Sequence, residues 1–582
     1  MVTDASPSSG TSERPTRLVV VGGVAGGMSA AARARRLSER AEIVVLEQSA
    51  YVSFANCGLP YHLSGEIERR DSLLLHTPES LAASLALDVR TGSRVTAIDR
   101  GARVVTVEAA DGAYELAYDA LVLAPGAVAV RPPIEGIDHP AVHALRTIPD
   151  LDALQERVTE LTRHRGEAPR AVVIGAGFIG LEAVEALVGR GLQVELVELA
   201  DHVLPPLDAE LAPLLAAELA AHDVGLHLGV SAVAVADSAE AAVAVSLSDG
   251  TVLDADVVVV NVGVRPASEL ARSAGLELGP TGAIRVDADQ RTSDPAIWAV
   301  GDAVEVRQAV TGASGAVPLA GPANRQGRRA ADAILGHRTT PQAEVLGTAI
   351  VRVFGLTAAV TGASQAALER AGIDHEVVRV HPGHHAGYYP GAEQLHIVAS
   401  FAPDGRLLGA QAVGRQGVDK RIDVLATALR AGMTADDLAE LELAYAPPFG
   451  SAKDAVNMLG FVAQNALDGT MPQWHPRDLD EVRATTLVLD VRSRREFERG
   501  HLPEALNVPH TELRGYLDEV RRAAAGRPVS VHCASGFRSY LATRILLDAG
   551  LAARNLSGGW ISLTLARPDA TSADAVREEA RA

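Results

Sequence analysis

Short apolar runs rich in β-branched residues, each followed by glycines or an acidic residue, mark the first part of this chain. Residues 18–21 form such a run and end in Gly22-Gly23, an Ala/Arg-rich helical stretch follows, and a second run over 41–46 ends at Glu47. A strand, a helix and a second strand in this order are typical of a βαβ unit. The pattern therefore predicts a parallel α/β domain that begins near residue 17.

The same pattern recurs further along the chain. Residues 170–174 are an apolar run, the glycine turn 175–180 and a helical stretch follow, and the run 193–197 ends at Glu198. Each unit of this kind can hold one dinucleotide at the turn between its first strand and its helix. Two units in one chain predict two nucleotide cofactors.

The rest of the chain shows two further patterns. Between 342 and 468 the periodicity is mixed, with strand-like runs at 349–353 and 395–401, which predicts a separate α+β domain. A last α/β unit opens with the run 486–490 and contains a second marked strand that leads directly into Cys533.

These patterns predict an α/β protein with two Rossmann-like dinucleotide-binding domains, an α+β domain and a C-terminal α/β domain. Residues 1–16 are rich in Ser, Thr, Pro and Asp, and we expect a disordered tail there. The predicted domain boundaries are 17–150 together with 272–340 for the first, discontinuous domain, 151–271 for the second, 341–468 for the third, 469–483 for a polar linker, and 484–570 for the last.

The composition of the chain mainly excludes certain kinds of partner. The 582 residues include 53 Lys and Arg against 73 Asp and Glu, so the formal net charge is −20. This balance argues against nucleic acid or an anionic membrane as a partner, although a small anionic ligand needs only local positive charge. No apolar run is long enough to span a membrane and the N-terminus lacks a signal-peptide pattern, so we expect a cytoplasmic protein.

The chain has only two cysteines, Cys57 and Cys533. A secreted disulfide scaffold would be richer in cysteine, and a C-x-x-C zinc site is excluded, so we expect no metal centre of that kind. A dithiol formed by two cysteines of one segment is excluded as well. Any thiol chemistry is therefore single-cysteine chemistry at one or two places.

The first glycine turn fits a dinucleotide-binding fingerprint, with Val24 at the place of the middle glycine. Backbone N–H groups of such a turn hold a pyrophosphate at the helix N-terminus, and a carboxylate such as Glu47 accepts hydrogen bonds from ribose. An ordinary βα turn is the alternative interpretation. The turn residues expected to bind the cofactor are Gly22, Gly23, Ala25, Gly26 and Gly27.

A second motif favours a flavin at this turn. The run 292–302 resembles the second flavin fingerprint of two-dinucleotide flavoproteins, in which the last residue, here Asp302, holds the ribityl chain. The segment 118–126 resembles the strand and turn that cross between the domains of those proteins. The resemblance implies FAD.

The second glycine turn has all three glycines, Gly175, Gly177 and Gly180, between a strand and a helix. Glu198 at the end of the next strand favours the free 2′-hydroxyl of NADH and repels the 2′-phosphate of NADPH. No arginine follows Glu198 directly. We therefore expect NADH, and a lax choice between the two nucleotides is the alternative.

The segment Ser53–Tyr61, with Cys57 at its centre, resembles the coenzyme A disulfide reductases, the single-cysteine branch of the pyridine nucleotide disulfide oxidoreductases. The resemblance covers about 17–465. It implies that Cys57 is the thiolate that attacks a disulfide or persulfide beside the flavin. The residues that match coenzyme A contacts of that family are Ser29, Arg33, Arg36, Ser53, Asn56 and Lys453. A solvated helix face is the alternative for the two arginines.

The segment 445–453 resembles the dimerisation segment of the same family, which reaches the flavin site of the partner subunit. The resemblance implies a homodimer in which Tyr445 lies near flavin and thiol as a proton donor or hydrogen-bonding group. The sequence Tyr388-Tyr389-Pro390 resembles the other tyrosine loop of that interface. Which of these two tyrosines faces the site stays open, and packing is the alternative role for all three.

The C-terminal unit resembles a rhodanese domain, both in the run 487–492 and in 500–509. The segment 533–539 resembles the loop on which such a sulfurtransferase carries sulfane sulfur as a cysteine persulfide, here on Cys533. Backbone N–H groups that lead into a helix can cradle an anion, and Arg538 adds positive charge.

The main functional hypothesis follows from the fusion of the two modules. The arrangement resembles the coenzyme A disulfide reductase–rhodanese fusions, in which NADH reduces FAD and the flavin reduces a disulfide or persulfide at Cys57. The expected substrates are small thiols, disulfides or persulfides, with coenzyme A as substrate or cosubstrate, and Cys533 would load or relay sulfur. One alternative is an NADH oxidase or peroxidase that uses a Cys57 sulfenic acid. Another is a sulfur carrier or redox sensor with little turnover.

Overall fold

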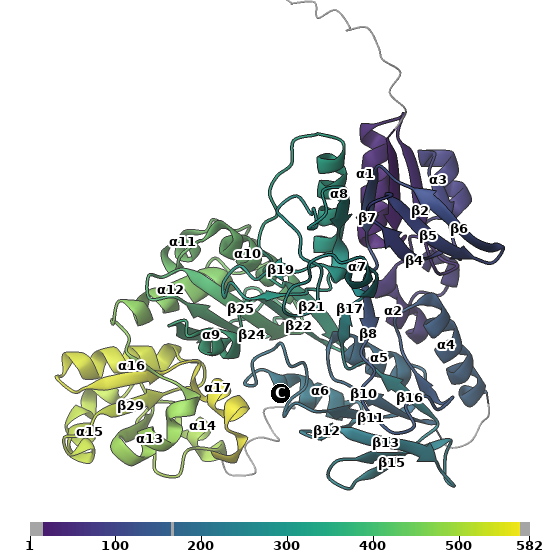
Figure 1. Cartoon of the computed structure of the whole chain (residues 1–582). Coiled ribbons are helices and arrows are strands. Elements are labelled where there is room, and N and C mark those ends of the chain that lie inside the picture. The colour runs from purple at the N-terminus through teal and green to yellow at the C-terminus, as the bar shows by residue number, and fades with distance from the viewer. Residues whose placement is uncertain (1–15, 164–167, 571–582) are drawn as a thin grey trace, which may run out of the picture.

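The computed structural model describes residues 16–163 and 168–570 (Figure 1). The predicted disordered tail therefore lies, except for residue 16, outside the described residues. The described chain forms four units, and each is built on its own five-stranded sheet.

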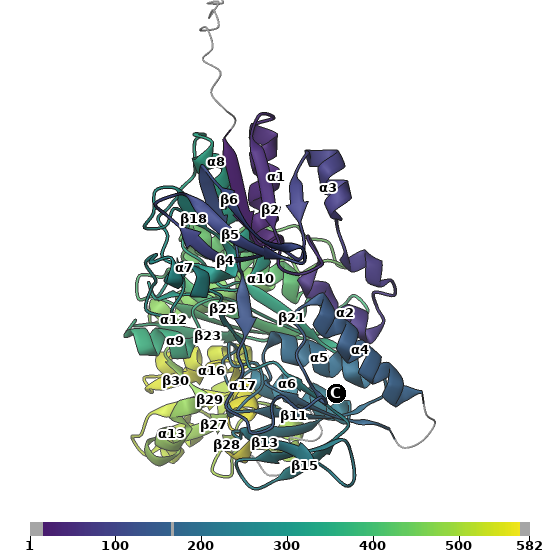
Figure 2. The ribbon, with the colours of Figure 1, turned by 45° about the vertical axis from the view of Figure 1, so that its right-hand side comes forward.

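The first unit has a parallel sheet with strand order β18-β7-β1-β2-β3. Its strands are β1 (Arg17–Val21), β2 (Glu42–Leu46), β3 (Asp88–Arg90), β7 (Ala120–Leu123) and β18 (Ile297–Ala299). An antiparallel sheet adds β4 (Arg94–Asp99), β5 (Val104–Ala109) and β6 (Gly112–Ala117). The helices are α1 (Ala25–Leu37), α2 (Leu59–Ser64), α3 (Pro78–Leu85) and α8 (Ala320–Ile334). Helices α1 and α8 lie side by side although they are far apart in sequence (Figures 1 and 2).

The second unit repeats this plan with strand order β12-β11-β10-β16-β9, all parallel. Its strands are β9 (Val142–His143), β10 (Arg170–Ile174), β11 (Gln193–Glu198), β12 (Gly225–Leu228) and β16 (Val257–Val260). An antiparallel sheet adds β13 (Ala232–Asp237), β14 (Val243–Leu247) and β15 (Val252–Ala255). The helices in this part of the chain are α4 (Ile148–Thr162), α5 (Phe178–Gly189), α6 (Ala212–Ala221) and α7 (Glu269–Ser273).

Two short strand pairs and a third unit complete this part of the chain. The pairs are β8 (Ala127–Ala129) with β17 (Val264–Pro266), and β19 (Val306–Arg307) with β20 (Ser314–Gly315). The antiparallel sheet of the third unit contains β21 (Ala349–Val353), β22 (Leu356–Gly362), β23 (Glu376–Val380), β24 (Leu395–Phe401) and β25 (Leu407–Gly414). Its helices are α9 (Gln365–Ala371), α10 (Val418–Ala431), α11 (Ala435–Glu440) and α12 (Ala455–Leu467).

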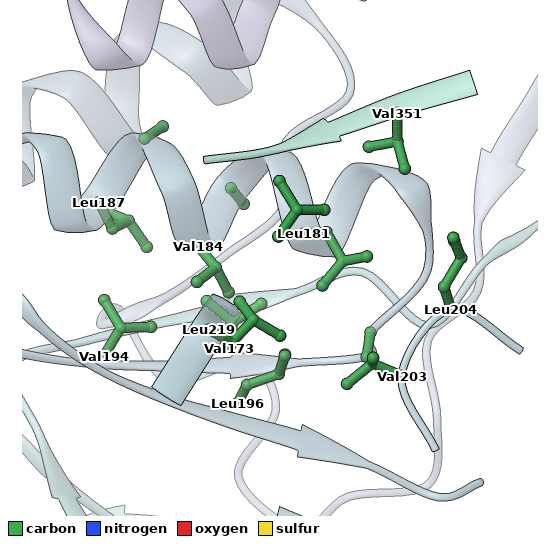
Figure 3. Packing of buried hydrophobic residues seen from close by; sticks show 14 of the residues in the cluster. Val173, Leu181, Val184, Leu187, Val194, Leu196, Val203, Leu204, Leu219 and Val351 are labelled. Carbon is green, nitrogen blue, oxygen red and sulfur yellow. The ribbon is translucent and has the colours of Figure 1, made fainter. Parts of the chain in front are cut away.

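Figure 3 shows how the core of the second unit is packed. Leu181, Val184 and Leu187 of α5 point toward Val173 and Leu196 of the sheet. Apolar side chains cover the strands because helices shield both faces of a parallel sheet from water. The same cluster continues into the third unit, whose strand β21 contributes a buried valine at position 351. The second and third units therefore share one core.

The last unit has a parallel sheet with strand order β26-β30-β29-β27-β28. Its strands are β26 (Gln473–Trp474), β27 (Leu487–Asp490), β28 (Leu506–Asn507), β29 (Val529–His532) and β30 (Ala553–Leu556). Its helices are α13 (Leu479–Thr485), α14 (Arg494–Arg499), α15 (Leu517–Ala524), α16 (Phe537–Asp548) and α17 (Gly559–Ala566).

The prediction of a linker over 469–483 was wrong for most of that segment. Trp474 is fully buried and belongs to strand β26, which pairs with β30, and α13 begins at Leu479. The indole N–H of Trp474 donates to the carbonyl oxygen of Val531. A polar stretch with prolines conceals this edge strand because a strand of two residues has no readable period.

The predicted fold class is confirmed: the chain contains two Rossmann-like units, a mixed α/β unit with an antiparallel sheet, and a C-terminal α/β unit. In residues 16–163 and 168–570 no helix combines the length and the apolar character needed to cross a membrane.

Candidate active site

The first glycine turn has the geometry of a pyrophosphate cradle. Gly22 has a φ of 101°, and a Cβ there would lie 2.1 Å from the carbonyl oxygen of Ala124. A Cβ on Gly27 would lie 1.9 Å from the carbonyl oxygen of Gly22. Only glycine allows this turn and this close approach of helix α1 to it.

Glu47 is fixed against this turn. Its carboxylate accepts hydrogen bonds from the backbone N–H groups of Gly23, at 2.7 Å, and Ser49, at 2.8 Å. The second flavin motif, which ends at Asp302, packs against the same turn: a Cβ on Gly26 would lie 3.0 Å from Val300 and 3.6 Å from Gly301, and Asp302 lines the same cleft as Gly26. The two motifs that predict FAD therefore meet at one place.

The second glycine turn repeats the first. Gly175 has a φ of 103°, and a Cβ on Gly180 would lie 1.9 Å from the carbonyl oxygen of Gly175. The Glu198 carboxylate accepts from the N–H groups of Ala176, at 2.6 Å, and Ala200, at 2.9 Å. A Cβ on Gly177 would meet nothing within 4 Å, so the turn is open on that side. Both turns fit a dinucleotide.

One continuous cleft of about 3220 Å³ joins the two turns. Typical pockets for a single small ligand have about 300–1,000 Å³, so this cleft has room for more than one. Cys57 lines the cleft and follows strand β2 through the short 3-10 helix Asn56–Gly58. The other predicted site residues that line it are Gly22, Ala25, Gly26, Ser29, Arg33, Arg36, Glu47, Ser53, Asn56, Gly175, Gly177, Glu198 and Asp302.

Some of the candidate coenzyme A residues already have partners within the protein, and others do not. Arg33 donates to Asp332 of α8 at 2.7 Å, so its charge is already compensated, whereas Arg36 is exposed. Asn56 donates to the carbonyl oxygen of Arg146, but its side-chain oxygen is buried and has no partner among the described residues. A buried polar atom without a partner fits a ligand that supplies the missing hydrogen bond.

The surroundings of Cys57 oppose its ionisation. Burial raises the pKa of the Cys57 thiol, and the carboxylates of Glu182 and Asp302 raise it further. Glu182, which was not predicted as a site residue, lies on α5 and accepts a hydrogen bond from the Tyr61 hydroxyl at 3.0 Å. Burial also raises the pKa of Glu182 itself. A signal was present: Glu182 and Glu185 are the two charged residues of an otherwise apolar helix.

Replacing this carboxylate should make the thiol more reactive. Glu182→Gln removes a negative charge that raises the pKa of Cys57, so more thiolate is present at neutral pH. A unit charge at 4 Å is worth about 1 kcal/mol in water, so we expect alkylation of Cys57 to be several-fold faster. The measurement is the iodoacetamide reaction rate of the reduced protein in a Cys533→Ser background, in which Cys57 is the one cysteine left.

Glu185→Gln is the matched control, because Glu185 lies one turn further along α5 and pairs with Arg352 at 2.8 Å. Equal acceleration in both variants would show that Glu182 has no special influence on the thiol.

The tyrosines lie away from this cleft within the protomer. Tyr445 and Lys453 are not among the described residues that line it. The hydroxyls of Tyr388 and Tyr445 lie 2.9 Å apart on exposed loops, whereas Tyr389 packs edge-on against His385. Of the two adjacent tyrosines, Tyr388 is therefore the one that accompanies Tyr445.

Cys533 lies in a second, separate site. It is 1% exposed, at the end of strand β29, and its sulfur accepts hydrogen bonds from the Gly536 N–H and the Ser539 hydroxyl, both at 3.2 Å. The start of α17 fixes this loop, because the N–H of Trp560 donates to the Cys533 carbonyl oxygen at 2.7 Å. A Cβ on Gly559 would lie 2.7 Å from that same oxygen. The loop is a rigid cradle for a sulfur anion.

Arg538 stands beside this cradle but is not free. Its guanidinium binds the carboxylate of Glu496 through two hydrogen bonds of 2.6 and 2.8 Å. Arg538 was predicted from the sequence of the loop, whereas Glu496, 42 positions away, was not.

The fold and the two thiol sites define a class: a two-dinucleotide oxidoreductase joined to a sulfurtransferase-like domain. Family models agree. Residues 16–327 match the pyridine nucleotide-disulphide oxidoreductases, 348–456 match the dimerisation domain of that family, and 471–564 match the rhodanese-like domain. The chain belongs to the pyridine nucleotide-disulphide oxidoreductase family.

Three relatives are informative. The coenzyme A disulfide reductase of Staphylococcus haemolyticus is 35% identical over 452 residues, which are 77% of this chain and 99% of that protein. The crystal structure of reduced Bacillus anthracis CoADR-RHD has a TM-score of 0.92 and 41% identity and covers 96% of this chain and 99% of that one. An NAD-dependent persulfide reductase from A. fulgidus has a TM-score of 0.87 and 39% identity, over 94% of this chain and all of that chain.

Proposed function

We propose that this protein is an NADH-dependent, FAD-containing reductase of coenzyme A disulfide or persulfide with a fused sulfurtransferase. The observation that carries the proposal is the single cleft in which Cys57 lies with both glycine turns and with the exposed Arg36. The named activities of the three relatives support it. The rhodanese-like unit accounts for the second cysteine.

The chain's own residues divide the work in this cleft. The glycine turns would hold the two pyrophosphates, with Glu47 and Glu198 on the ribose hydroxyls and Asp302 on the ribityl chain. When bound, FAD supplies the two-electron connection between NADH and the Cys57 sulfur.

The Cys57 thiolate attacks one sulfur of the substrate, the substrate S–S bond breaks, and its other half leaves as a thiol or as hydrogen sulfide. The leaving thiolate needs a proton. The paired hydroxyls of Tyr388 and Tyr445 supply a donor when the dimer brings them to the cleft of the other subunit. A single cysteine suffices in this scheme because coenzyme A itself provides the second sulfur.

For coenzyme A, the proposed contacts are Ser29, Arg33, Arg36, Ser53 and Asn56 in one subunit and Lys453 in the other. The buried, unpartnered oxygen of Asn56 supports a polar ligand beside the thiol. At the second site, Cys533 would carry sulfane sulfur as a persulfide.

The proposal includes a homodimer that works in the cytoplasm. The match to a dimerisation domain supports the dimer. Both cysteines are free thiols in the structure, and a reducing compartment keeps them so.

Steady-state NADH consumption with different electron acceptors tests the proposal. Coenzyme A persulfide, coenzyme A disulfide and polysulfide should be reduced faster than oxygen or hydrogen peroxide. Faster turnover with oxygen or peroxide would favour an oxidase or peroxidase, and negligible turnover with all of them would favour a carrier or sensor.

The nucleotide preference gives a separate prediction. Glu198 should make kcat/KM with NADH at least several-fold higher than with NADPH, because like charges 4 Å apart cost about 1 kcal/mol in water and more where water is excluded. Glu198→Gln should narrow this ratio, since the amide oxygen still accepts a hydrogen bond but carries no charge.

Glu47→Gln is the control, because Glu47 makes the same backbone contacts at the other turn. Glu47→Gln should alter FAD retention without changing the ratio of kcat/KM with NADH to kcat/KM with NADPH. Equal kcat/KM for NADH and NADPH in the natural protein would show that Glu198 does not set the preference.

A further inference from the structure

The charge next to the Cys533 cradle is already compensated. Arg538 contacts the cradle from the first turn of α16, and its two hydrogen bonds to Glu496 use both terminal nitrogens of the guanidinium. Hydrogen bonding to Glu496, and then the charges of Glu496 and Cys533, raise the pKa of Arg538, so the guanidinium lies close to both groups. An arriving anion therefore meets an ion pair rather than a free cation.

Glu496 is held in place by a second set of contacts. Its carboxylate accepts from the N–H of Ser493, at 2.9 Å, and from the Ser493 hydroxyl, at 2.7 Å, in the capping box that begins α14. Hydrogen bonds from Arg538 lower the pKa of Glu496 to about 2. Its negative charge is therefore fixed in position and present throughout the physiological pH range.

Two other basic groups near Cys533, Arg492 and His532, add no uncompensated positive charge. Arg492 binds the buried carboxylate of Asp490 at 2.7 Å and stacks on the Trp560 ring. Burial lowers the pKa of His532, beside Cys533, to about 4, so this imidazole is neutral at pH 7. The hydrogen bonds that the sulfur accepts from the loop come from two neutral donors, the Gly536 N–H and the Ser539 hydroxyl, and the one guanidinium close to it, that of Arg538, is shared with Glu496.

Apolar surface borders the same loop. Phe537 follows Gly536 directly and is 63% exposed, and Leu541, one turn later on α16, is also exposed. Residues four apart share a helix face, so the two form one apolar strip. Such a strip can pack against the organic part of a persulfide, but it makes no favourable contact with a small inorganic anion.

We infer that Glu496 determines donor specificity at Cys533: by neutralising Arg538 it selects singly charged or neutral organic persulfides over the dianion thiosulfate. The inference rests on the proposed sulfurtransferase function of Cys533. Glu496 acts through Arg538 and is a positioning residue.

Persulfides and thiosulfate transfer sulfur by the same two-electron displacement, but they differ in the charge that they bring into the site. In both cases the Cys533 thiolate attacks the sulfane sulfur, and the donor S–S bond breaks with its electron pair on the leaving group. A persulfide RSSH leaves as RS⁻ and produces Cys533–SSH. With thiosulfate, sulfite is the leaving group and the product is Cys533–SS⁻. The Cys533 thiolate and the dianion together bring three negative charges into the site. Coulomb repulsion then requires an uncompensated cation.

The test follows the loading of Cys533 in the full-length flavoprotein with a Cys57→Ser substitution. Thiosulfate and 2-hydroxyethyl persulfide, which has no charged group besides the persulfide itself, are the two donors, and intact mass after rapid alkylation measures the rate of persulfide formation. With Glu496 intact, 2-hydroxyethyl persulfide should load faster. Glu496→Gln should raise the thiosulfate rate about tenfold relative to the persulfide rate, because Arg538 gains an uncompensated charge next to the dianion.

Two further variants keep the test sharp. Glu512→Gln removes the partner of Arg494, an arginine of α14 that is likewise held by two hydrogen bonds to one carboxylate, and should leave the donor ratio unchanged. Glu496→Gln with Arg538→Met should lose the gain for thiosulfate, which a merely loosened loop would keep.

The outcomes separate the two proposals. If neither donor loads Cys533 in the protein with Glu496 intact, the sulfurtransferase function fails. If both donors load it and Glu496→Gln leaves their ratio unchanged, or Glu512→Gln shifts it equally, the function stands and the specificity inference is wrong.

Discussion

Cys57→Ser should still bind FAD and accept electrons from NADH, yet lose at least about 10³-fold in disulfide and persulfide reduction, as expected when a catalytic nucleophile is removed. Serine has nearly the size of cysteine, and the two glycine turns and their carboxylates do not depend on the thiol. The hydroxyl, however, is a poor nucleophile near neutral pH, whereas a thiolate is accessible. The loss should therefore appear in chemistry and not in cofactor binding.

Two measurements separate these effects. Anaerobic bleaching of the flavin absorbance by NADH should proceed as in the natural protein, and NADH consumption with coenzyme A persulfide should nearly stop. Retained persulfide turnover in purified Cys57→Ser would place the reaction elsewhere. Loss of flavin together with activity would mean that the residue is structural.

Strands with strong apolar runs could be predicted from the sequence. The predicted runs 170–174, 349–353 and 395–401 coincide with β10, β21 and β24. β10 and β24 lie inside their sheets and β21 lies at an edge, but all three are rich in β-branched and other apolar residues, so pattern alone identifies them. The glycine turns were equally readable, since the close backbone approaches at Gly27 and Gly180 allow no side chain.

What could not be predicted depends on contacts between distant segments. Glu182 meets Tyr61 because α2 packs on α5, 121 positions away in sequence. Arg33, expected to serve a ligand, is paired with Asp332, 299 positions away, because α1 lies against α8. Local spacing identifies the residue type in such cases but not its partner.

The C-terminal domain is fastened to the rest of the protein close to its sulfur loop. The side chain of His381, just after β23, lies 2.8 Å from the Ser562 hydroxyl of α17, and Arg379 contacts His475 at 2.9 Å. Helix α17 also holds the carbonyl oxygens of the Cys533 loop. Because β23 leads into the loop that carries Tyr388, these contacts connect the surroundings of Cys533 with that tyrosine loop. In Figure 1 the yellow C-terminal domain lies against the green third domain, away from the purple first one.

Removing the Cys533 thiol should affect sulfur transfer alone and leave the flavin-binding part of the protein active. Cys533→Ser should abolish transfer of sulfur from thiosulfate or persulfides, because no other cysteine in residues 469–582 can form the persulfide. The flavin half should survive, since Cys57 and the cofactor motifs all lie before residue 468. Substitution by serine keeps the side chain short inside the cradle formed by Gly536 and Ser539, so we expect the domain to stay docked.

The decisive comparison is NADH oxidation by natural and Cys533→Ser protein with small and with protein-bound persulfides. Coenzyme A persulfide can enter the cleft and reach Cys57 directly, so its reduction should be unchanged. A protein persulfide is too bulky for that cleft and should depend on Cys533 to pass sulfur to a small carrier. An equal fall for both substrates would mean that Cys533 takes part in the core reaction. No fall for either would mean that the C-terminal domain does not supply the flavin site, and the fusion would then need another explanation.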